Sequence, residues 1–239
     1  MFGRFLELGI ATPDIAASVQ HYERLGFSQL LTGDAFTHRY GVLSDGRVPL
    51  GLHEHATPSP TLTFVLPQLL HAQRRLRDHG FEPELAQFGD DALHQLRLRD
   101  PGGHAVTLLE ARTYSPAHRG AQAGSLCGYF SHLSLPQPDF ERAREFWERA
   151  GFVALDEEAA PFAHLPLTSD HLDLAFHAPQ TFDAPLLVFE CADLAAVRAR
   201  LSALSVPLAT RLPCGVQARD GVLILAPEGT ATLLRASAD

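Results

Sequence analysis

Two histidines and one glutamate in the second half of the chain, His132, His177 and Glu190, are the residue types of a two-His, one-carboxylate metal site. Such a site leaves coordination positions open for the oxygen atoms of a substrate. We expect the three side chains to lie at different depths along their strands, which argues against one shared metal ion. His132 by itself predicts a hydrogen-bonded histidine in a pocket or in the core.

Arg235 adds a cationic group to the same half of the chain. A guanidinium group binds a carboxylate or another anion through paired hydrogen bonds, so Arg235 with Glu190 indicates a polar ligand pocket. The alternative is that Arg235 and Glu190 form an ion pair between neighbouring strands, which contributes little to stability. The sequence leaves both interpretations open.

Glu7 has the most unusual setting in the first half, because it interrupts an apolar strand, Phe5-Leu6-Glu7-Leu8. A buried carboxylate is costly unless it is paired. One interpretation is that Glu7 pairs with an Arg or a His, or acts as a base. The other is that it faces solvent at a sheet edge. His53 is a helper for Glu7 at the end of a later strand, and we expect His53-Glu54-His55 to form a solvated loop mouth.

The composition sets the broad class of the protein. The chain has 239 residues, 46% of them hydrophobic and 20% charged, which is typical of a globular protein. Its formal net charge of −9 argues against nucleic acid as a partner. No secretory signal and no apolar run of about 18 residues is present, so we expect a cytoplasmic protein that does not cross a membrane.

Motifs of nucleophilic and nucleotide-binding sites are missing from the sequence. It contains no G-x-S-x-G elbow, no P-loop and no G-x-G-x-x-G run. The three cysteines are widely spaced and form no C-x-x-C pair, which is typical of a reducing compartment.

An internal repeat organises the residues named above. Its landmarks recur at an offset of 125 residues, which pairs Glu7 with His132, Asp14 with Asp139 and Gly26 with Gly151. Each copy begins with a strand, continues with a helix that an Asp caps and a Gly ends, and closes with further strands. The duplication supplies a pseudo-two-fold pair inside one chain, so both a monomer and a homodimer are compatible with it.

Four strand–helix–strand–strand–strand units follow from the hydrophobic periodicity. The first has strands at 5–11, 28–31, 36–43 and 48–53 and a helix from Asp14 to about Leu25. The second has strands at 61–65, 82–87, 93–98 and 104–109 and a helix at 68–79. The third has a strand ending at Leu135, a helix at 140–150 and strands near 153, 163 and 172–177. The fourth has a strand at 186–190, a helix at 194–204 and strands up to Leu234.

The predicted fold class is α+β, with the four βαβββ units paired into two domains. The domains span residues 1–112 and 128–239. The segment 113–127 between them is rich in Gly, Ser and Pro and is predicted to be a linker. Each domain is expected to be a cupped mixed sheet whose concave face holds a small ligand.

These features resemble the vicinal oxygen chelate superfamily, which includes glyoxalases, fosfomycin- and bleomycin-resistance proteins and extradiol dioxygenases. The resemblance rests on helices that end in aromatic-x-x-x-Gly-Phe, at Tyr22–Phe27 and Trp147–Phe152, and on the Asp100-Pro101-Gly102-Gly103 turn before a strand. It also rests on the four-fold unit and its length. The resemblance covers nearly the whole chain and implies two glyoxalase-like domains, but a fold does not determine a chemistry.

The resemblance also implies where a metal ion would bind. In the enzymes of this superfamily the ligands to Zn, Fe, Mn or Ni come from the first strand of each unit and from the last strand of a domain. In this sequence the first position is Glu7 in one half and His132 in the other. The remaining positions fall on Thr61 and Thr107 in the first half, and on Leu186 and Leu233 in the second. Threonine and leucine are poor ligands, so the usual set is incomplete in both halves.

The sequence therefore predicts a protein that binds a small organic ligand in a cupped sheet, without a metal ion or another cofactor. The ligand-binding residues are predicted to be Glu7, His53, Thr61, Thr107, His132, His177, Glu190 and Arg235. The alternative is a metal-dependent lyase, isomerase or dioxygenase whose rearranged site is formed by His132, His177 and Glu190. A third hypothesis is a catalytically silent scaffold in which side chains fill both cups.

Overall fold

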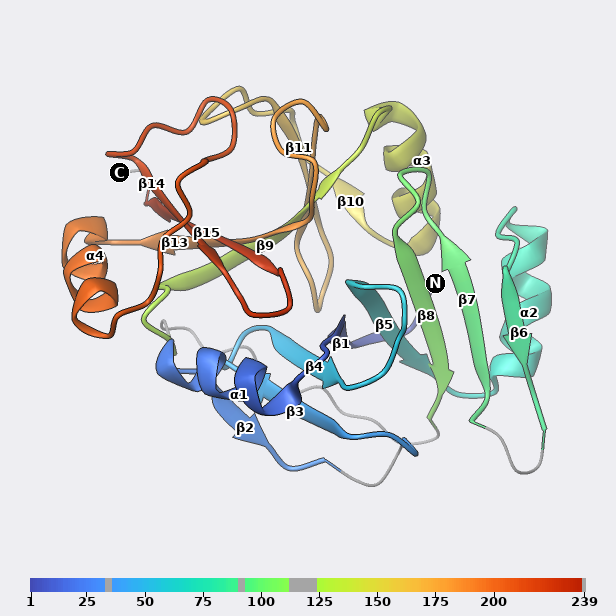
Figure 1. Ribbon diagram of the computed structural model, residues 1–239. Coiled ribbons are helices and arrows are strands. Elements are labelled where there is room, and N and C mark those ends of the chain that lie inside the picture. Colours follow the sequence, from blue (N-terminus) through green and yellow to red (C-terminus); the bar gives the residue numbers. More distant parts are fainter. Residues whose placement is uncertain (33–35, 90–92, 112–123, 238–239) are drawn as a thin grey trace.

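The computed structural model describes residues 1–32, 36–89, 93–111 and 124–237. These residues form four helices and two mixed β-sheets, one in each half of the chain (Figure 1). Within the described ranges, no helix has both the length and the apolar composition that crossing a membrane requires.

The N-terminal sheet has eight strands in the order β2-β3-β4-β1-β5-β8-β7-β6. Its strands are β1 (Arg4–Ala11), β2 (Ser28–Leu30), β3 (Tyr40–Ser44), β4 (Pro49–His53), β5 (Thr61–Leu66), β6 (Leu85–Gln87), β7 (Gln95–Arg99) and β8 (Ala105–Glu110). Its helices are α1 (Ile15–Arg24) and α2 (Leu69–Asp78). The first strand of each unit lies at the centre, where β1 pairs with β5 in antiparallel orientation.

The C-terminal sheet has seven strands in the order β10-β11-β12-β9-β13-β15-β14. Its strands are β9 (Tyr129–Pro136), β10 (Val153–Ala154), β11 (His164–Thr168), β12 (Leu174–His177), β13 (Leu186–Cys191), β14 (Gly221–Leu225) and β15 (Ala231–Ala236). Its helices are α3 (Phe140–Ala150) and α4 (Leu194–Ala203). The arrangement repeats that of the N-terminal sheet, with β9 and β13 at the centre.

The predicted α+β architecture with four units is confirmed, with local differences, among them a strand expected at 82–87 that begins only at Leu85. The strand expected at 36–43 begins only at Tyr40, because the ring of Phe36 packs against those of Tyr40 and His53. In the fourth unit one strand is reduced to an isolated bridge between Leu208 and Ile224. Most of the predicted linker, 113–123, lies outside the described residues, and the domain boundaries stay a prediction.

The strands bury one face against the helices and leave the other face to form a cup. In β4, for example, Leu50 and Leu52 belong to the hydrophobic core, so Gly51 and His53 point to the opposite face. Strand alternation and pairing place these residues in the N-terminal cup: Glu7, Tyr40, Gly51, His53, Thr61, Thr63, Arg97 and Thr107. The matching positions form the C-terminal cup: His132, His164, Ala175, His177, Leu186, Val188, Leu223 and Leu233.

Each half of the chain places one of its turns against a helix of the other half (Figure 1). Asp100, in the turn before β8, accepts hydrogen bonds from Gln137 Nε2 at 2.5 Å and from Trp147 Nε1 at 3.3 Å. Glu228, in the turn before β15, accepts hydrogen bonds from Ser18 Oγ and the Tyr22 hydroxyl, each at 2.7 Å. The larger hydrophobic core is continuous across this contact and contains side chains of both halves.

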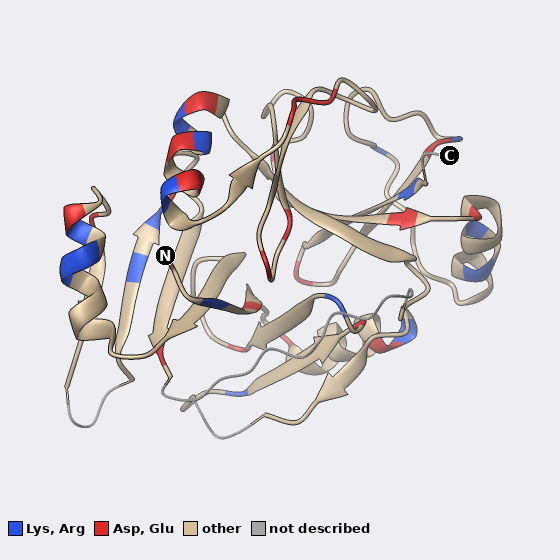
Figure 2. Ribbon diagram, turned by 180° about the vertical axis from the view of Figure 1, so that it is seen from behind, with Lys and Arg blue, Asp and Glu red and all other residues tan. Residues whose placement is uncertain are grey.

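Charged residues gather on the helices and turns, whereas most of the strand residues carry no charge (Figure 2). Glu7 and Arg97 are charged side chains on strands of the N-terminal cup, and both are at least partly buried. Buried charges on a sheet face are uncommon unless they are paired or bind a ligand.

Candidate functional site

A β-bulge aims the side chain of Glu7 into the N-terminal cup. Phe5 pairs with Phe64 and Glu7 pairs with Thr63, which leaves Leu6 as the extra residue of β1. The same bulge occurs in β9, where Ser131 is the extra residue and His132 lies opposite Val188. Bulges bend a strand and redirect its side chains, so both halves present one side chain at the same place in their cups.

Glu7 is buried, with 1% of its surface exposed, and both of its carboxylate oxygens are engaged. Oε1 lies 3.1 Å from His53 Nε2, and Oε2 accepts a hydrogen bond from the hydroxyl of Tyr40. The prediction that Glu7 pairs with a histidine is confirmed, and the alternative that it faces solvent at a sheet edge is wrong. The central position of β1 in the sheet explains the burial.

The Glu7 carboxylate fits into the cup because residue 51 is a glycine. A Cβ atom built on Gly51 would lie 2.2 Å from Cδ of Glu7. Any side chain at this position of β4 would therefore displace the carboxylate. Gly51 is a requirement of the site that the sequence does not reveal.

A chain of aromatic and imidazole rings extends from Glu7 toward the surface. His53 Nδ1 lies 3.0 Å from His38 Nε2, and the His38 ring stacks on that of His55 with 4.9 Å between the ring centroids. Burial, followed by the neighbouring His53 and His55, lowers the pKa of His38. His55 is exposed, as expected for a loop mouth, whereas His53 is buried. This series of rings links the buried carboxylate of Glu7 to the half-buried imidazole of His38, and it can hold a proton or pass one between them.

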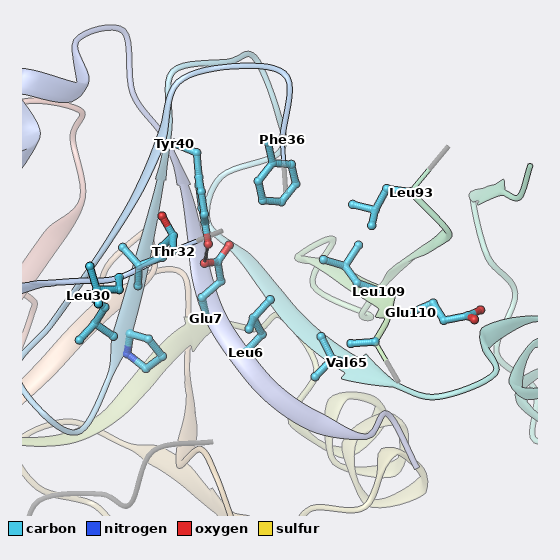
Figure 3. A pocket seen from close by; sticks show the side chains of 14 residues that line it. Leu6, Glu7, Leu30, Thr32, Phe36, Tyr40, Val65, Leu93, Leu109 and Glu110 are labelled. Carbon is cyan, nitrogen blue, oxygen red and sulfur yellow. Dashed lines mark hydrogen bonds between the residues drawn. The ribbon is translucent and has the colours of Figure 1, made fainter. Parts of the chain in front are cut away.

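An open cavity of about 390 Å³ lies over Glu7 and Tyr40 (Figure 3). Its walls are mostly apolar and include Leu6, Leu30, Phe36, Val65, Leu93 and Leu109. Glu110 also lines it, but its carboxylate accepts a hydrogen bond from Leu69 N at 3.0 Å and lies 3.1 Å from His94 Nδ1. The hydrogen-bonded pair of Glu7 and Tyr40 is therefore a polar group within an apolar wall, as in many small-molecule sites of this size.

The remaining predicted residues of the first half lie on the same face. Thr107 is next to Thr63 in the parallel pair of β5 and β8, and Thr63 is opposite Glu7. Thr61 lies two residues further along β5, and its hydroxyl donates a hydrogen bond to Pro58 O at 2.5 Å. The pairing thus puts Thr63, not Thr61, beside Glu7. Without the bulge at Leu6, the pairing of Phe5 with Phe64 would have set Leu62 opposite Glu7, so the bulge shifts the register by one residue.

Apolar side chains fill the C-terminal cup. Six buried residues form a hydrophobic cluster there: Phe162, Leu186, Val188, Leu223, Ala231 and Leu233. Phe182, Leu212 and Val216 from the loops pack against this cluster. The hypothesis of a filled cup therefore describes the second half of the molecule, whereas the first half contains the cavity described above.

Two histidines of the C-terminal cup, His132 and His177, are buried and engaged with neutral partners, whereas His164 Nε2 lies 3.5 Å from Glu158 Oε2. His132 Nδ1 lies 3.1 Å from Ser131 Oγ, and burial, followed by the nearby Arg235, His164 and His177, lowers the pKa of His132 to about 3. His177 lies between Ser134 Oγ at 2.7 Å and Phe182 O at 2.9 Å. Burial lowers the pKa of His177 to about 4. Both imidazoles are neutral at pH 7 and serve the packing of the cup.

Glu190 and Arg235 form an ion pair between neighbouring strands, with 2.7 Å between Arg235 Nη2 and Glu190 Oε1. Of the two interpretations for these residues, the ion pair is confirmed. Glu190 pairs with Tyr129 and His177 pairs with Pro136. These levels are seven residues apart on β9, or about 23 Å at about 3.3 Å per residue. Glu190, His132 and His177 therefore do not converge.

The donor atoms do not fit the metal ion that the superfamily resemblance implies. Beside His132, the positions on the neighbouring strands are the hydrocarbon side chains Val188 and Leu233. In the other cup, Glu7 and His53 bond to each other and to other side chains, and threonines fill the next positions. Across the described ranges, no three His, Cys, Asp or Glu side chains are grouped so that they could hold a metal ion.

Four residues of the N-terminal cup were not identified from the sequence: Tyr40, Gly51, Thr63 and Arg97. Tyr40 stands 124 residues before His164, the same offset that relates His53 to His177, so the repeat contains a signal for it. Thr63 could be identified only from the position of the bulge in β1. Arg97 could be identified only from the register of β7 and β8, which pairs it with Thr107.

Solved structures with the same fold include extradiol dioxygenases. A catechol 2,3-dioxygenase matches with a TM-score of 0.62 and 16% identity, over 98% of this chain and 88% of its own. A halotolerant catechol dioxygenase matches with a TM-score of 0.61 and 18% identity, over 99% and 88%. Homoprotocatechuate 2,3-dioxygenase from Brevibacterium fuscum, in complex with 3,4-dihydroxyphenylacetate, matches with a TM-score of 0.64 and 15% identity, over 99% and 80%.

No protein-family model and no curated protein matches the sequence significantly. At 14–18% identity the structural matches establish the fold, and they confirm the resemblance to the vicinal oxygen chelate superfamily at that level. Chemistry does not follow from a shared fold, so the function has to be argued from the two cups themselves.

Proposed function

We propose that this protein binds a small organic molecule in the N-terminal cup and does so without a metal ion. The observation that carries the proposal is the cavity of about 390 Å³ in which the carboxylate of Glu7 meets an apolar wall. A buried carboxylate that accepts a hydrogen bond from a phenol, as Glu7 does from Tyr40, can also accept one from a hydroxyl or amino group of a ligand.

The fold supports this proposal, because the structural neighbours act on small molecules. One of them is in complex with 3,4-dihydroxyphenylacetate, an aromatic ring with hydroxyl groups. A ligand of this size and polarity suits a cavity whose apolar residues surround one hydrogen-bonded pair. The alternative, a metal-dependent lyase, isomerase or dioxygenase around His132, needs donor atoms where Val188 and Leu233 stand.

Metal analysis tests the metal-free part of the proposal. Protein purified without added metal should contain Zn, Fe, Mn and Ni at far less than one equivalent, because the donors near Glu7 and His132 do not converge. One equivalent of any of these metals, lost from a Glu7→Gln or His132→Ala variant, would overturn it.

Binding of two neutral probes tests the role of the cavity. We expect 4-hydroxyphenylacetamide to bind more tightly than phenylacetamide, because both carry the amide but only the first has a phenolic hydroxyl that can donate a hydrogen bond to Glu7. Glu7→Gln should weaken 4-hydroxyphenylacetamide about tenfold and leave phenylacetamide unchanged, since a hydrogen bond to a charged group contributes about 1.5–3 kcal/mol. NMR titration measures both affinities.

The matched control is Glu190→Gln, which makes the same substitution in the other sheet. Glu190 pairs with Arg235 and lies outside the N-terminal cup, so its loss should leave both affinities unchanged. Equal effects of the two substitutions, or binding that perturbs no signal of the N-terminal cup, would contradict the proposal.

A further inference from the structure

Arg97 places a cation on the cup face of β7. Its neighbours Leu96 and Leu98 are buried in the hydrophobic core, so the side chain of Arg97 points to the opposite face. Arg97 pairs with Thr107, a residue of the N-terminal cup. Its Nε atom is buried and has no hydrogen-bond partner among the described residues.

Arg99, two residues further along the same strand, shows how an arginine on this face is normally satisfied. Its Nε donates to Glu84 Oε2 at 2.7 Å, and its Nη1 donates to Gly103 O at 2.8 Å. No carboxylate of the described residues lies within ion-pair distance of Arg97. A partly buried guanidinium with an unmet donor is unfavourable unless an anion joins it, and guanidinium groups bind carboxylates well.

Arg97 and Glu7 lie at opposite ends of one row across the cup. The row runs from Glu7 through Thr63 and Thr107 to Arg97, one residue on each of four neighbouring strands. Three strand spacings of about 4.8 Å separate their Cα atoms by about 14 Å along the sheet. The cavity wall approaches this row at β8, where Leu109 lies two residues from Thr107, the partner of Arg97, on the same face of the strand.

We propose that the ligand of the N-terminal cup is a small carboxylic acid that also carries a hydroxyl or amino group. The carboxylate pairs with Arg97, and the hydroxyl or amino group at the other end donates to Glu7. This inference rests on the proposed function, since it names the chemical class of molecule that the same cup takes. The C-terminal cup has Leu223 in place of Arg97 and Leu233 in place of Thr107, so the recognition belongs to the first half alone.

The test compares 4-hydroxyphenylacetate with its amide, 4-hydroxyphenylacetamide, by NMR titration of wild type, Arg97→Met and Arg99→Met. Wild type should bind the acid about tenfold more tightly than the amide or better, which is about 1.4 kcal/mol. Arg97→Met should abolish that preference and leave the amide unaffected. Arg99→Met should retain the preference, because Arg99 is satisfied by Glu84 and Gly103.

The outcomes separate this inference from the proposed function. If both probes bind equally in wild type and Glu7→Gln still weakens them, the cup takes neutral molecules and the inference alone is wrong. If neither probe perturbs the NMR signals of the N-terminal cup, both the proposed function and this inference are wrong. An acid preference that Arg97→Met leaves intact would also overturn the assignment of Arg97.

Thermal unfolding of the ligand-free variants gives a second readout. Arg97→Met should match or exceed the wild-type melting temperature, because it removes an unmet buried donor and keeps an apolar stem. Arg99→Met should lower it, because an ion pair and a backbone contact are lost. A clear loss of stability in Arg97→Met would show that Arg97 serves the fold, and would overturn the inference.

Discussion

Glu7 and Gly51 act together, because the carboxylate of one occupies the space that a side chain of the other would need. A Cβ atom at position 51 would lie 2.2–2.4 Å from three atoms of the Glu7 carboxylate group. Glu7 in turn accepts hydrogen bonds from Tyr40 and lies beside His53. One methyl group on β4 therefore disturbs three side chains of the site.

We predict that Gly51→Ala lowers the free energy of unfolding by about 1–3 kcal/mol, as overpacking does, and weakens probe binding in the N-terminal cup. Urea unfolding and NMR titration measure the two effects. Gly9→Ala is the matched control, because Gly9 pairs with Gly51 and its added Cβ would meet atoms no closer than 3.6 Å. Equal losses in both variants would show that the contact with Glu7 is not the cause.

The buried histidines of the C-terminal cup make stability depend on pH. The pKa values of His132 and His177 are lowered to about 3 and about 4, so both side chains are neutral in the folded protein at pH 5. In the unfolded chain their pKa is near 6.5, so the unfolded state binds more protons at that pH. Their contribution to stability is present above about pH 6.5 and is lost as the pH falls toward 4 and 3.

We predict that lowering the pH from 7 to 5 reduces the free energy of unfolding by about 2 kcal/mol for each of these two histidines. Urea unfolding at both pH values measures the loss. A His177→Gln variant should lose less, because it removes one of the two groups. His71→Gln changes an exposed histidine of α2 and should leave the pH dependence as it is in wild type. The same loss in all three proteins would contradict this assignment.

Helix ends were predictable from the sequence because their signals are local. Asp14 and Asp139 each accept a hydrogen bond from the backbone three residues on, as an N-cap does, and Gly151 ends α3 in a left-handed conformation. The residue opposite Glu7 was not predictable, because the bulge at Leu6 shifts the register of β1 and β5 by one residue and so sets Thr63 opposite Glu7. The positions of the site residues depend on long-range strand pairing, whereas the ends of the helices depend on local sequence.

The start of α2 is the exception among the four helices. Its N-cap residue, Gln68, has a left-handed backbone with φ of 54° and makes no side-chain cap hydrogen bond. A carboxylate from another strand, that of Glu110, accepts the hydrogen bond of Leu69 N instead. The conformation costs a non-glycine residue roughly 1–2 kcal/mol, and glycine adopts it freely.

We predict that Gln68→Gly raises the free energy of unfolding by about 1 kcal/mol or slightly less, because glycine relieves the strain and gives up some chain entropy. Gln73→Gly, inside α2, is the control and should lower it by about 1 kcal/mol, since glycine is a poor helix former. Urea unfolding of both variants measures the difference. A loss of stability in Gln68→Gly would show that the Gln68 side chain contributes more than its backbone costs.

At the scale of the whole molecule, the repeat has produced two halves with different cups. The same bulge presents Glu7 in one half and His132 in the other. Tyr40, Arg97 and the threonines give the first cup polar groups beside a cavity, whereas leucines and valine close the second. The sequence predicted this asymmetry at Leu186 and Leu233, but only the paired strands show that the apolar cluster fills the C-terminal cup.

The contact between the two halves leads to a prediction about how the protein unfolds. Asp100 is buried and accepts hydrogen bonds from Gln137 and Trp147 of the other half, and one hydrophobic core contains side chains of both. The predicted domain boundaries would allow each half to unfold alone. The shared core instead predicts one cooperative transition for the whole chain.

Trp147, the one tryptophan of the sequence, lies at the contact between the two halves, so its fluorescence reports the loss of that contact. We predict that fluorescence and far-UV circular dichroism give coincident urea transitions in wild type. Asp100→Ala should shift both together and cost about 3 kcal/mol or more, because buried donors of Gln137 and Trp147 lose their acceptor. Asp156→Ala, at an exposed position, should shift neither. A fluorescence transition that precedes the dichroism transition would show that the halves separate before they unfold.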